Sequence, residues 1–184
     1  MANADTPSGF RPVGGLDGSP YNGATIECAI LAADGTATFV GDAVKLSGTA
    51  AADGSPAVVQ AAATNSVFGV ITSFSPNPDN LSLQYRAAST LRHCQVAPAL
   101  DNLFVVQCSG SSAITDIGEA ADIVVGAGST VTGMSAMELE ATLGTGDTTM
   151  LLGLSREPNN EFGTNANLIV RFNETSLRSV GTII

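Results

Sequence analysis

The chain has 184 residues, of which 44% are hydrophobic and 13% are charged, and its 17 acidic and 7 basic side chains give a net charge of -10. This length and composition are typical of one globular domain and exclude an intrinsically disordered chain. The charge also argues against DNA or RNA as a direct partner, because a phosphate backbone is bound by clustered Lys and Arg and this sequence has only one Lys.

The first 22 residues predict an extended N-terminal arm. Closely spaced Gly and Pro disfavour a helix there, and apolar periodicity is weak. A compact group of side chains in the arm is suited to contact another protein, because aromatic residues and Arg are frequent interface anchors. The group consists of Phe10, Arg11, Pro12, Val13 and Tyr21. The alternative is a terminus that is simply mobile.

Short apolar segments alternate with turn sequences through the rest of the chain. The pair Asp34-Gly35 lies between the segments 24–31 and 36–48 and predicts a hairpin, because Gly accepts a positive φ. In the segment 167–174, apolar side chains at every second residue predict a strand with one buried face. The other strands are expected at 66–74, 81–89, 103–110, 122–128 and 149–155.

Many short strands separated by Gly, Asp, Asn and Pro predict an all-β body, either a single barrel or a sandwich of short antiparallel strands. The sequence does not choose between the two. The expected organisation is an extended N-terminal arm over residues 1–22, the all-β body over 23–175 and a C-terminal tail over 176–184.

Residues 135–143 fit two predictions. Ser135 and Glu138 have the spacing of a capping box and Gly144 follows, which is typical of a short helix. The same residues alternate between apolar and polar, which is typical of a strand. We favour the strand, because the residues before it are poor helix formers. A single helical turn is expected after Asp116, which would cap its N-terminus.

The residues predict no catalytic, cofactor or metal site. The sequence has no serine-hydrolase elbow, phosphate-binding loop or dinucleotide motif. The only His, His93, adjoins Cys94, but successive residues of a strand point to opposite faces. Glu138 and Glu140 would lie about 7 Å apart on a strand, as in an inverting glycosidase. With no aromatic platform nearby, a solvated strand face is the preferred interpretation, and we expect a non-enzymatic protein.

The cysteines indicate a reducing compartment. Cys28, Cys94 and Cys108 are odd in number and irregularly spaced, which favours buried, reduced thiols over a disulfide framework. No secretory signal is recognised and no apolar segment has the length of a membrane span. We therefore expect folding in a cytoplasm and no membrane partner.

Several segments, in their order along the chain, resemble a known family. They are MANADTPSGFRPV, GGLDGSPYNGAT, FVGDAVKLSG, QYRAAST, DNLFVVQ, STVTGMSAMELE and EPNNEFGTNANLIVRFN. Together they resemble the small structural proteins of tailed-bacteriophage virions, in the class of capsid decoration or cement proteins. The resemblance implies an all-β protein that binds the outer surface of the head at junctions between capsomers. It also implies a homotrimer that stabilises the shell against packaged DNA, assembled in the cytoplasm of the host bacterium.

The resemblance gives the arm a partner, the major capsid protein. In this hypothesis Phe10 fills a pocket of the shell and Arg11 pairs with a carboxylate, and deletion of residues 2–20 leaves a folded body that no longer binds. The loop 155–167, with Phe162, is a second contact candidate. The alternative function is a virion-surface adhesion module that binds host glycans. It would need aromatic platforms, and the sequence has only two Tyr and no Trp.

Overall fold

The computed structural model describes residues 3–144 and 146–177, and in this part of the chain the protein is all-β, as predicted. The only helical element described is one 3-10 turn, η1 (Ile114–Asp116). The strands are β1 (Arg11–Gly15), β2 (Ile26–Ile30), β3 (Ala43–Ala50), β4 (Pro56–Gln60), β5 (Gly69–Phe74), β6 (Arg92–Pro98), β7 (Asn102–Gln107), β8 (Ala120–Ala121), β9 (Ile123–Val124), β10 (Glu138–Leu139), β11 (Thr149–Leu154) and β12 (Asn167–Phe172).

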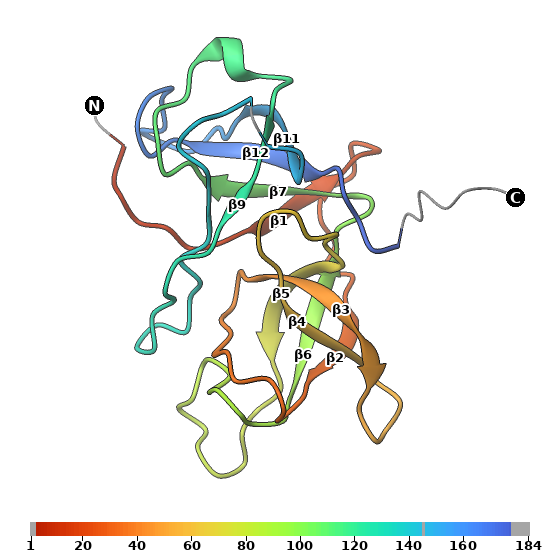
Figure 1. Cartoon of the computed structure of the whole chain (residues 1–184). Coiled ribbons are helices and arrows are strands. Elements are labelled where there is room, and N and C mark those ends of the chain that lie inside the picture. Colours follow the sequence, from red (N-terminus) through yellow and green to blue (C-terminus); the bar gives the residue numbers. More distant parts are fainter. Residues whose placement is uncertain (1–2, 145, 178–184) are drawn as a thin grey trace, which may run out of the picture.

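Five consecutive strands close into a barrel in the order β2-β4-β3-β5-β6. Of the two alternatives that the sequence left open, the structure contains a barrel. The strands of this barrel are not all antiparallel. β2 runs parallel to β4, with Ala29 opposite Ala57, and antiparallel to β6, with Cys28 opposite Cys94. In Figure 1 the barrel forms the lower half of the molecule.

The remaining strands form the upper half (Figure 1). A five-stranded sheet has the order β1-β7-β12-β11-β8, all neighbours antiparallel, and β9 and β10 form a separate pair. The alternation predicted for the last strand is confirmed, since Leu168, Val170 and Phe172 are buried. They belong to a core between the sheet and the barrel, which also takes in Val70 of β5 and Ala97 of β6.

A second, smaller core fills the inside of the barrel. It is built from Val, Ile, Cys and Phe, as a sequence poor in aromatic residues requires. Its buried members are Cys28, Ile30, Val44, Val58, Phe68, Ile71, Cys94 and Val96. All three cysteines of the chain are free and buried, as predicted.

The N-terminal segment is part of the folded body and not a free arm. Arg11 pairs with Val105 as β1 joins the edge of the sheet at β7. Phe10 is 1% exposed, its ring lies 5.1 Å from that of Phe172, and its N–H donates to the carbonyl of Gly41. The segment packs inward because it carries the Phe that completes the core. Most of the predicted C-terminal tail, residues 178–184, lies outside the described residues.

The predicted hairpin at Asp34-Gly35 is wrong, because β2 and β3 are not neighbours in the barrel. The turn itself forms, with the Asp34 carboxylate accepting from the N–H of Thr36 at 2.9 Å. However, the backbone around it bonds to a side chain and not to a strand. The buried guanidinium of Arg86 donates to the carbonyls of Leu31, Asp34 and Thr36.

The strand predicted at 81–89 is also wrong. This segment consists of turns and contributes one isolated bridge, between Thr38 and Arg86. The Arg86 side chain is fully buried and also donates to the carbonyl of Thr90 at 2.8 Å. Each of the three guanidinium nitrogens of this buried Arg donates to at least one carbonyl, so this part of the chain is held in place without strand pairing.

Of two local predictions, the strand within 135–143 is confirmed and the capping role of Asp116 is wrong. The strand favoured within 135–143 is confirmed by β10, which is short and pairs with β9. The helical turn is present, but Asp116 is its last residue and not its N-cap. The Asp116 carboxylate instead accepts from the N–H of Ala113, at 2.7 Å, and so closes the turn from its other end.

Candidate binding surface

The two contact candidates predicted from the sequence, the N-terminal segment and the loop 155–167, lie side by side. The guanidinium of Arg11 and the carboxylate of Glu157 form an ion pair at 2.7 Å. At the described start of the chain, the Asn3 amide donates to the carbonyls of Glu161 and Thr164, at 2.8 and 2.9 Å. The Asn3 side chain also accepts from the N–H of Glu161 at 3.0 Å. Both segments therefore belong to one surface.

Gln107, the last residue of β7, fastens the same segment to the sheet. Its amide donates to the carbonyl of Ala4 at 2.8 Å, and its oxygen accepts from the N–H of Thr6 at 3.1 Å. The side chain is 4% exposed and also donates to the carbonyl of Asn165. Because its polar atoms are used in this way, Gln107 is buried without an unsatisfied amide.

A hollow of about 310 Å³ lies between the two segments. Its walls are rich in amides, but those of the loop are largely committed to one another: Asn160 donates to the carbonyls of Ser155 and Asn167, and Asn167 donates to Glu157. The amide donors of Asn160 and Asn167 are therefore already used within the chain. It is lined by Asn3, Ala4, Thr6, Glu157, Pro158, Asn159, Asn160, Asn165 and Asn167.

The predicted contact residues differ in their access to a partner. Phe10 is buried, so its predicted insertion into a pocket of another protein does not fit this structure. Arg11 is exposed and paired within the chain, Pro12 is half-buried and Val13 is 44% exposed.

Tyr21 is half-buried and donates its hydroxyl to the carbonyl of Ala24 at 3.1 Å; burial raises the pKa of this phenol. Phe162 is 37% exposed at the edge of the loop.

Sequence reasoning did not single out Asn3, Gln107 or Glu157, which join the two segments. No local sequence pattern identifies them, because each contacts a residue more than a hundred positions away in the chain. Arg171 is one of the polar positions that alternate with the buried residues of the last strand. That alternation is the signal that identifies the outward-facing side chains of β12.

The residues that the sequence analysis weighed for catalysis have other partners or surroundings in the described structure. His93 forms a surface pair with Asp53 at 2.8 Å, and the neighbouring Cys94 is fully buried. Burial raises the pKa of Cys94 to about 12 and that of Cys28 to about 11, so neither thiol is a nucleophile at neutral pH. Glu140 accepts from the N–H of Asp122 and so stabilises the backbone.

Among residues 3–144 and 146–177, no three His, Cys, Asp or Glu side chains gather as metal ligands, and no helix is long and apolar enough to cross a membrane. The chain matched none of the family models, curated proteins or solved structures with which it was compared.

Proposed function

We propose that this protein is a capsid decoration or cement protein of a tailed bacteriophage. It binds the outer surface of the head at junctions between capsomers, where its partner is the major capsid protein, and it acts as a homotrimer assembled in the host cytoplasm. The observation that carries the proposal is the joining of the two contact candidates into one surface through Arg11 and Glu157. The sequence resemblance along the chain supports the same function.

The mechanism is geometric. A trimer that bridges several capsid subunits makes each later attachment effectively intramolecular, so modest individual contacts give tight binding. The net charge of -10 per chain keeps unattached trimers apart and suits the outside of the shell, away from the packaged DNA. An all-β body with the N-terminal segment fastened by Asn3 and Gln107 presents its surface without a large loss of conformational entropy on binding.

The glycan-binding alternative has less support, because neither tyrosine offers a free ring. Tyr85 stacks on Phe39 with ring centroids 5.2 Å apart. Tyr21 is half-buried against the core and its hydroxyl is used by Ala24. A sugar platform needs an exposed aromatic face.

The proposal is tested on virions and on heads that lack this protein. Cryo-electron microscopy of virions should place trimeric density between capsomers on the outer surface. Heads without the protein should release DNA at a lower temperature, and added purified protein should restore the higher temperature. Density confined to the tail, or equal release temperatures with and without the protein, would overturn the proposal.

A further inference from the structure

The segment between β1 and β2 contains the only Asn-Gly pair of the chain, Asn22 and Gly23, and both residues are exposed. Two hydrogen bonds hold this turn. The Tyr21 hydroxyl donates to the carbonyl of Ala24 at 3.1 Å, and the Ala24 N–H donates to Asn22 Oδ1 at 3.0 Å. The second bond closes an Asx-turn, which folds the Asn22 side chain back over the peptide bond to Gly23.

The turn brings together the groups needed for attack of the Gly23 nitrogen on the side-chain carbonyl carbon of Asn22. Among the described residues, neither the Gly23 N–H nor the Asn22 Nδ2 group donates a hydrogen bond, so nucleophile and leaving group are both unengaged. The Ala24 N–H already contacts Oδ1, the atom on which negative charge develops during the attack. Holding the reacting groups in one turn makes the step intramolecular.

Gly23 leaves its own nitrogen accessible. Its φ is +83°, a conformation that residues with a side chain rarely adopt. Apart from the chain neighbours of Gly23, no described atom lies within 4 Å of the position that a Cβ would occupy. Water and hydroxide can therefore reach the nitrogen from this side and remove its proton.

Other asparagines in turns of the same kind lack a suitable nitrogen. Asn77 and Asn80 also accept from the N–H two residues further on, at 2.9 and 3.1 Å. Asn77 is followed by Pro78, which has no N–H to lose. Asn80 is followed by Leu81, whose branched side chain crowds the nitrogen. Both residues are therefore internal comparisons for Asn22.

The Asp-Gly turns at Asp17 and Asp53 lack a suitable electrophile. Hydrogen bonds from Ser19 and Ser55 lower the pKa of the two side chains, so both are carboxylates at neutral pH, and a carboxylate resists attack. In both turns the Gly N–H is also engaged, by the carbonyl of the residue three positions earlier.

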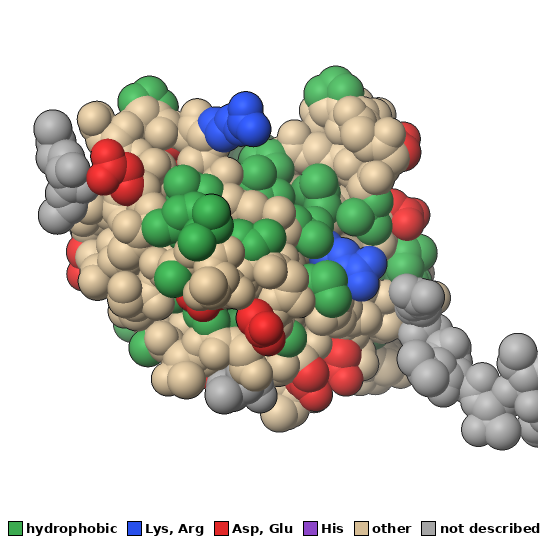
Figure 2. Space-filling view, turned by 90° about the horizontal axis from the view of Figure 1, so that it is seen from above, with side chains coloured by type: hydrophobic (Ala, Val, Ile, Leu, Met, Phe, Trp, Pro, Cys, Tyr) green, Lys and Arg blue, Asp and Glu red, His purple; other side chains and the backbone are tan. Residues whose placement is uncertain are grey.

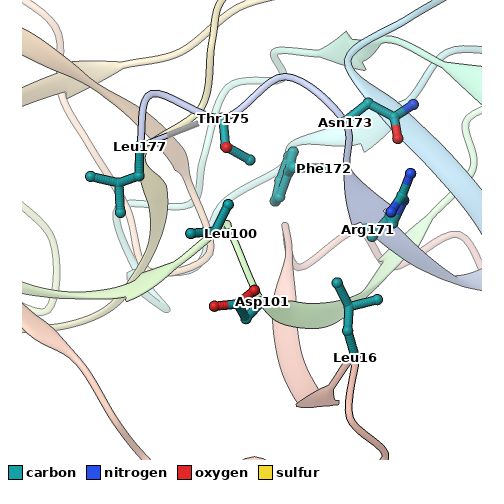
Figure 3. A pocket seen from close by; sticks show the side chains of 8 residues that line it. All are labelled: Leu16, Leu100, Asp101, Arg171, Phe172, Asn173, Thr175 and Leu177. Carbon is teal, nitrogen blue, oxygen red and sulfur yellow. The ribbon is translucent and has the colours of Figure 1, made fainter. Parts of the chain in front are cut away.

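The product of the attack has room beside the turn. A hollow of about 560 Å³ includes Asn22 and Ala24 in its walls. Leu16 and Asp101 line both this hollow and the one of about 270 Å³ shown in Figure 3, so the space continues along the molecule. A main chain lengthened by one carbon can bulge here without displacing the core.

We propose that Asn22 is a site of spontaneous deamidation in the folded protein. The Gly23 nitrogen forms a bond to Asn22 Cγ, the Cγ–Nδ2 bond breaks, and Nδ2 leaves as ammonia, which in the net reaction carries the proton lost by Gly23. The cyclic succinimide is then opened by water at either carbonyl. One opening gives aspartate, and the other gives isoaspartate, in which the main chain runs through Cβ. No oxidant, cofactor or enzyme takes part.

Each event adds one negative charge to a chain whose net charge is already -10. Figure 2 shows acidic side chains mostly toward the rim of the face seen from above, with few Lys or Arg among them. The modified protein should therefore bind an anion exchanger more strongly. The new carboxylate lies next to Tyr21, one of the contact candidates, so the surface offered there changes with the age of the molecule.

The test is incubation of the purified full chain in warm, mildly alkaline buffer, followed by peptide mapping with mass spectrometry. The peptide with Asn22 should gain the mass difference between –NH2 and –OH, and part of it should accept methyl groups from a protein isoaspartyl methyltransferase. Asn77 and Asn80 should keep their amides. Hydroxylamine added to the native protein should cleave the chain between residues 22 and 23, because it attacks the succinimide.

Asn22→Ser is the matched variant, since Ser keeps an acceptor for the Ala24 N–H but has no amide. It should lose the mass gain, the shift on the anion exchanger and the cleavage. Suppose that native Asn22 stays intact under conditions that convert it in the urea-unfolded chain; the turn would then protect the amide, and the inference would be wrong. Equal modification of Asn80 would also overturn it, because Gly23 would then play no part. None of these measurements uses binding to heads, so the result is independent of the proposed function.

Discussion

The Arg11 guanidinium and the Glu157 carboxylate lie 2.7 Å apart and join the first strand to a loop 146 residues further along the chain. Both side chains are well exposed, at 46% and 38%, so solvent screens the attraction. The pair therefore positions the loop more than it stabilises the fold.

The first prediction concerns this pair. Arg11→Ala should lower the free energy of unfolding by only about 0.2–1 kcal/mol, and less at high salt, as is usual for exposed ion pairs. A double-mutant cycle with Glu157→Gln in urea denaturation measures the coupling. Arg156→Ala, an exposed neighbour, is the control. A coupling well above 1 kcal/mol would show that the loop is held mainly by this contact.

The second prediction concerns Phe10. Replacing this buried ring by Ala should cost about 3–5 kcal/mol, because it leaves a cavity beside Phe172. Phe162→Ala, at a 37% exposed position, is the matched control and should cost much less. Deletion of residues 2–20 should therefore destabilise the body, contrary to the expectation from the sequence. Equal unfolding midpoints for Phe10→Ala and the wild type would contradict this packing.

The third prediction concerns Arg86. Arg86→Met should destabilise the protein by about 3 kcal/mol or more, because it removes the buried guanidinium that donates to the carbonyls of Leu31, Thr36 and Thr90. Arg156→Met removes the same charge from an exposed loop and should change the free energy of unfolding by less than about 0.5 kcal/mol. Guanidinium denaturation of both variants makes the comparison. Similar losses in the two would argue against the buried network.

The fourth prediction concerns pH. Burial raises the pKa of Asp42, although hydrogen bonds from Ser135, Phe39 and Gln60 oppose the shift. The folded state thus keeps the proton at a pH where the unfolded chain has lost it. The stability from this group is present below the unfolded pKa, about 3.9, and is lost as the pH rises through the folded pKa.

Asp42→Asn removes this titration. The free energy of unfolding of the variant, minus that of the wild type, should therefore increase as the pH rises from about 3 through the folded pKa, and then level off. Urea denaturation across that range measures it. A difference that stays constant with pH would show that Asp42 titrates alike in both states.

The strands that could be predicted are those whose side chains alternate against one core. Leu168, Val170 and Phe172 gave the last strand correctly because burial on a single face produces a period of two. The segment with Arg86 has the same period and forms no strand. Alternation cannot reveal that a guanidinium is buried and bonded to carbonyls, since those carbonyls come from other parts of the chain.

The two contact candidates were named from the sequence, but the contact between them was not predicted. Turn residues and interface-prone side chains pointed to the N-terminal segment and to the loop 155–167. Their mutual contact depends on Asn3, whose partners are backbone atoms of Glu161 and Thr164. Any residue can supply a backbone carbonyl, so a hydrogen bond from a side chain to a distant carbonyl cannot be predicted from the sequence.

The two halves of the molecule are built from different parts of the chain, and this matters during synthesis. All five barrel strands lie between Ile26 and Pro98, so they are complete when roughly half of the chain has been made. The aromatic partner of Phe10 is Phe172, close to the end of the described chain. A chain made only as far as Pro98 therefore has all five barrel strands but lacks the partner of Phe10, and the contacts of Asn3 can form only after residues 161–164 have been made.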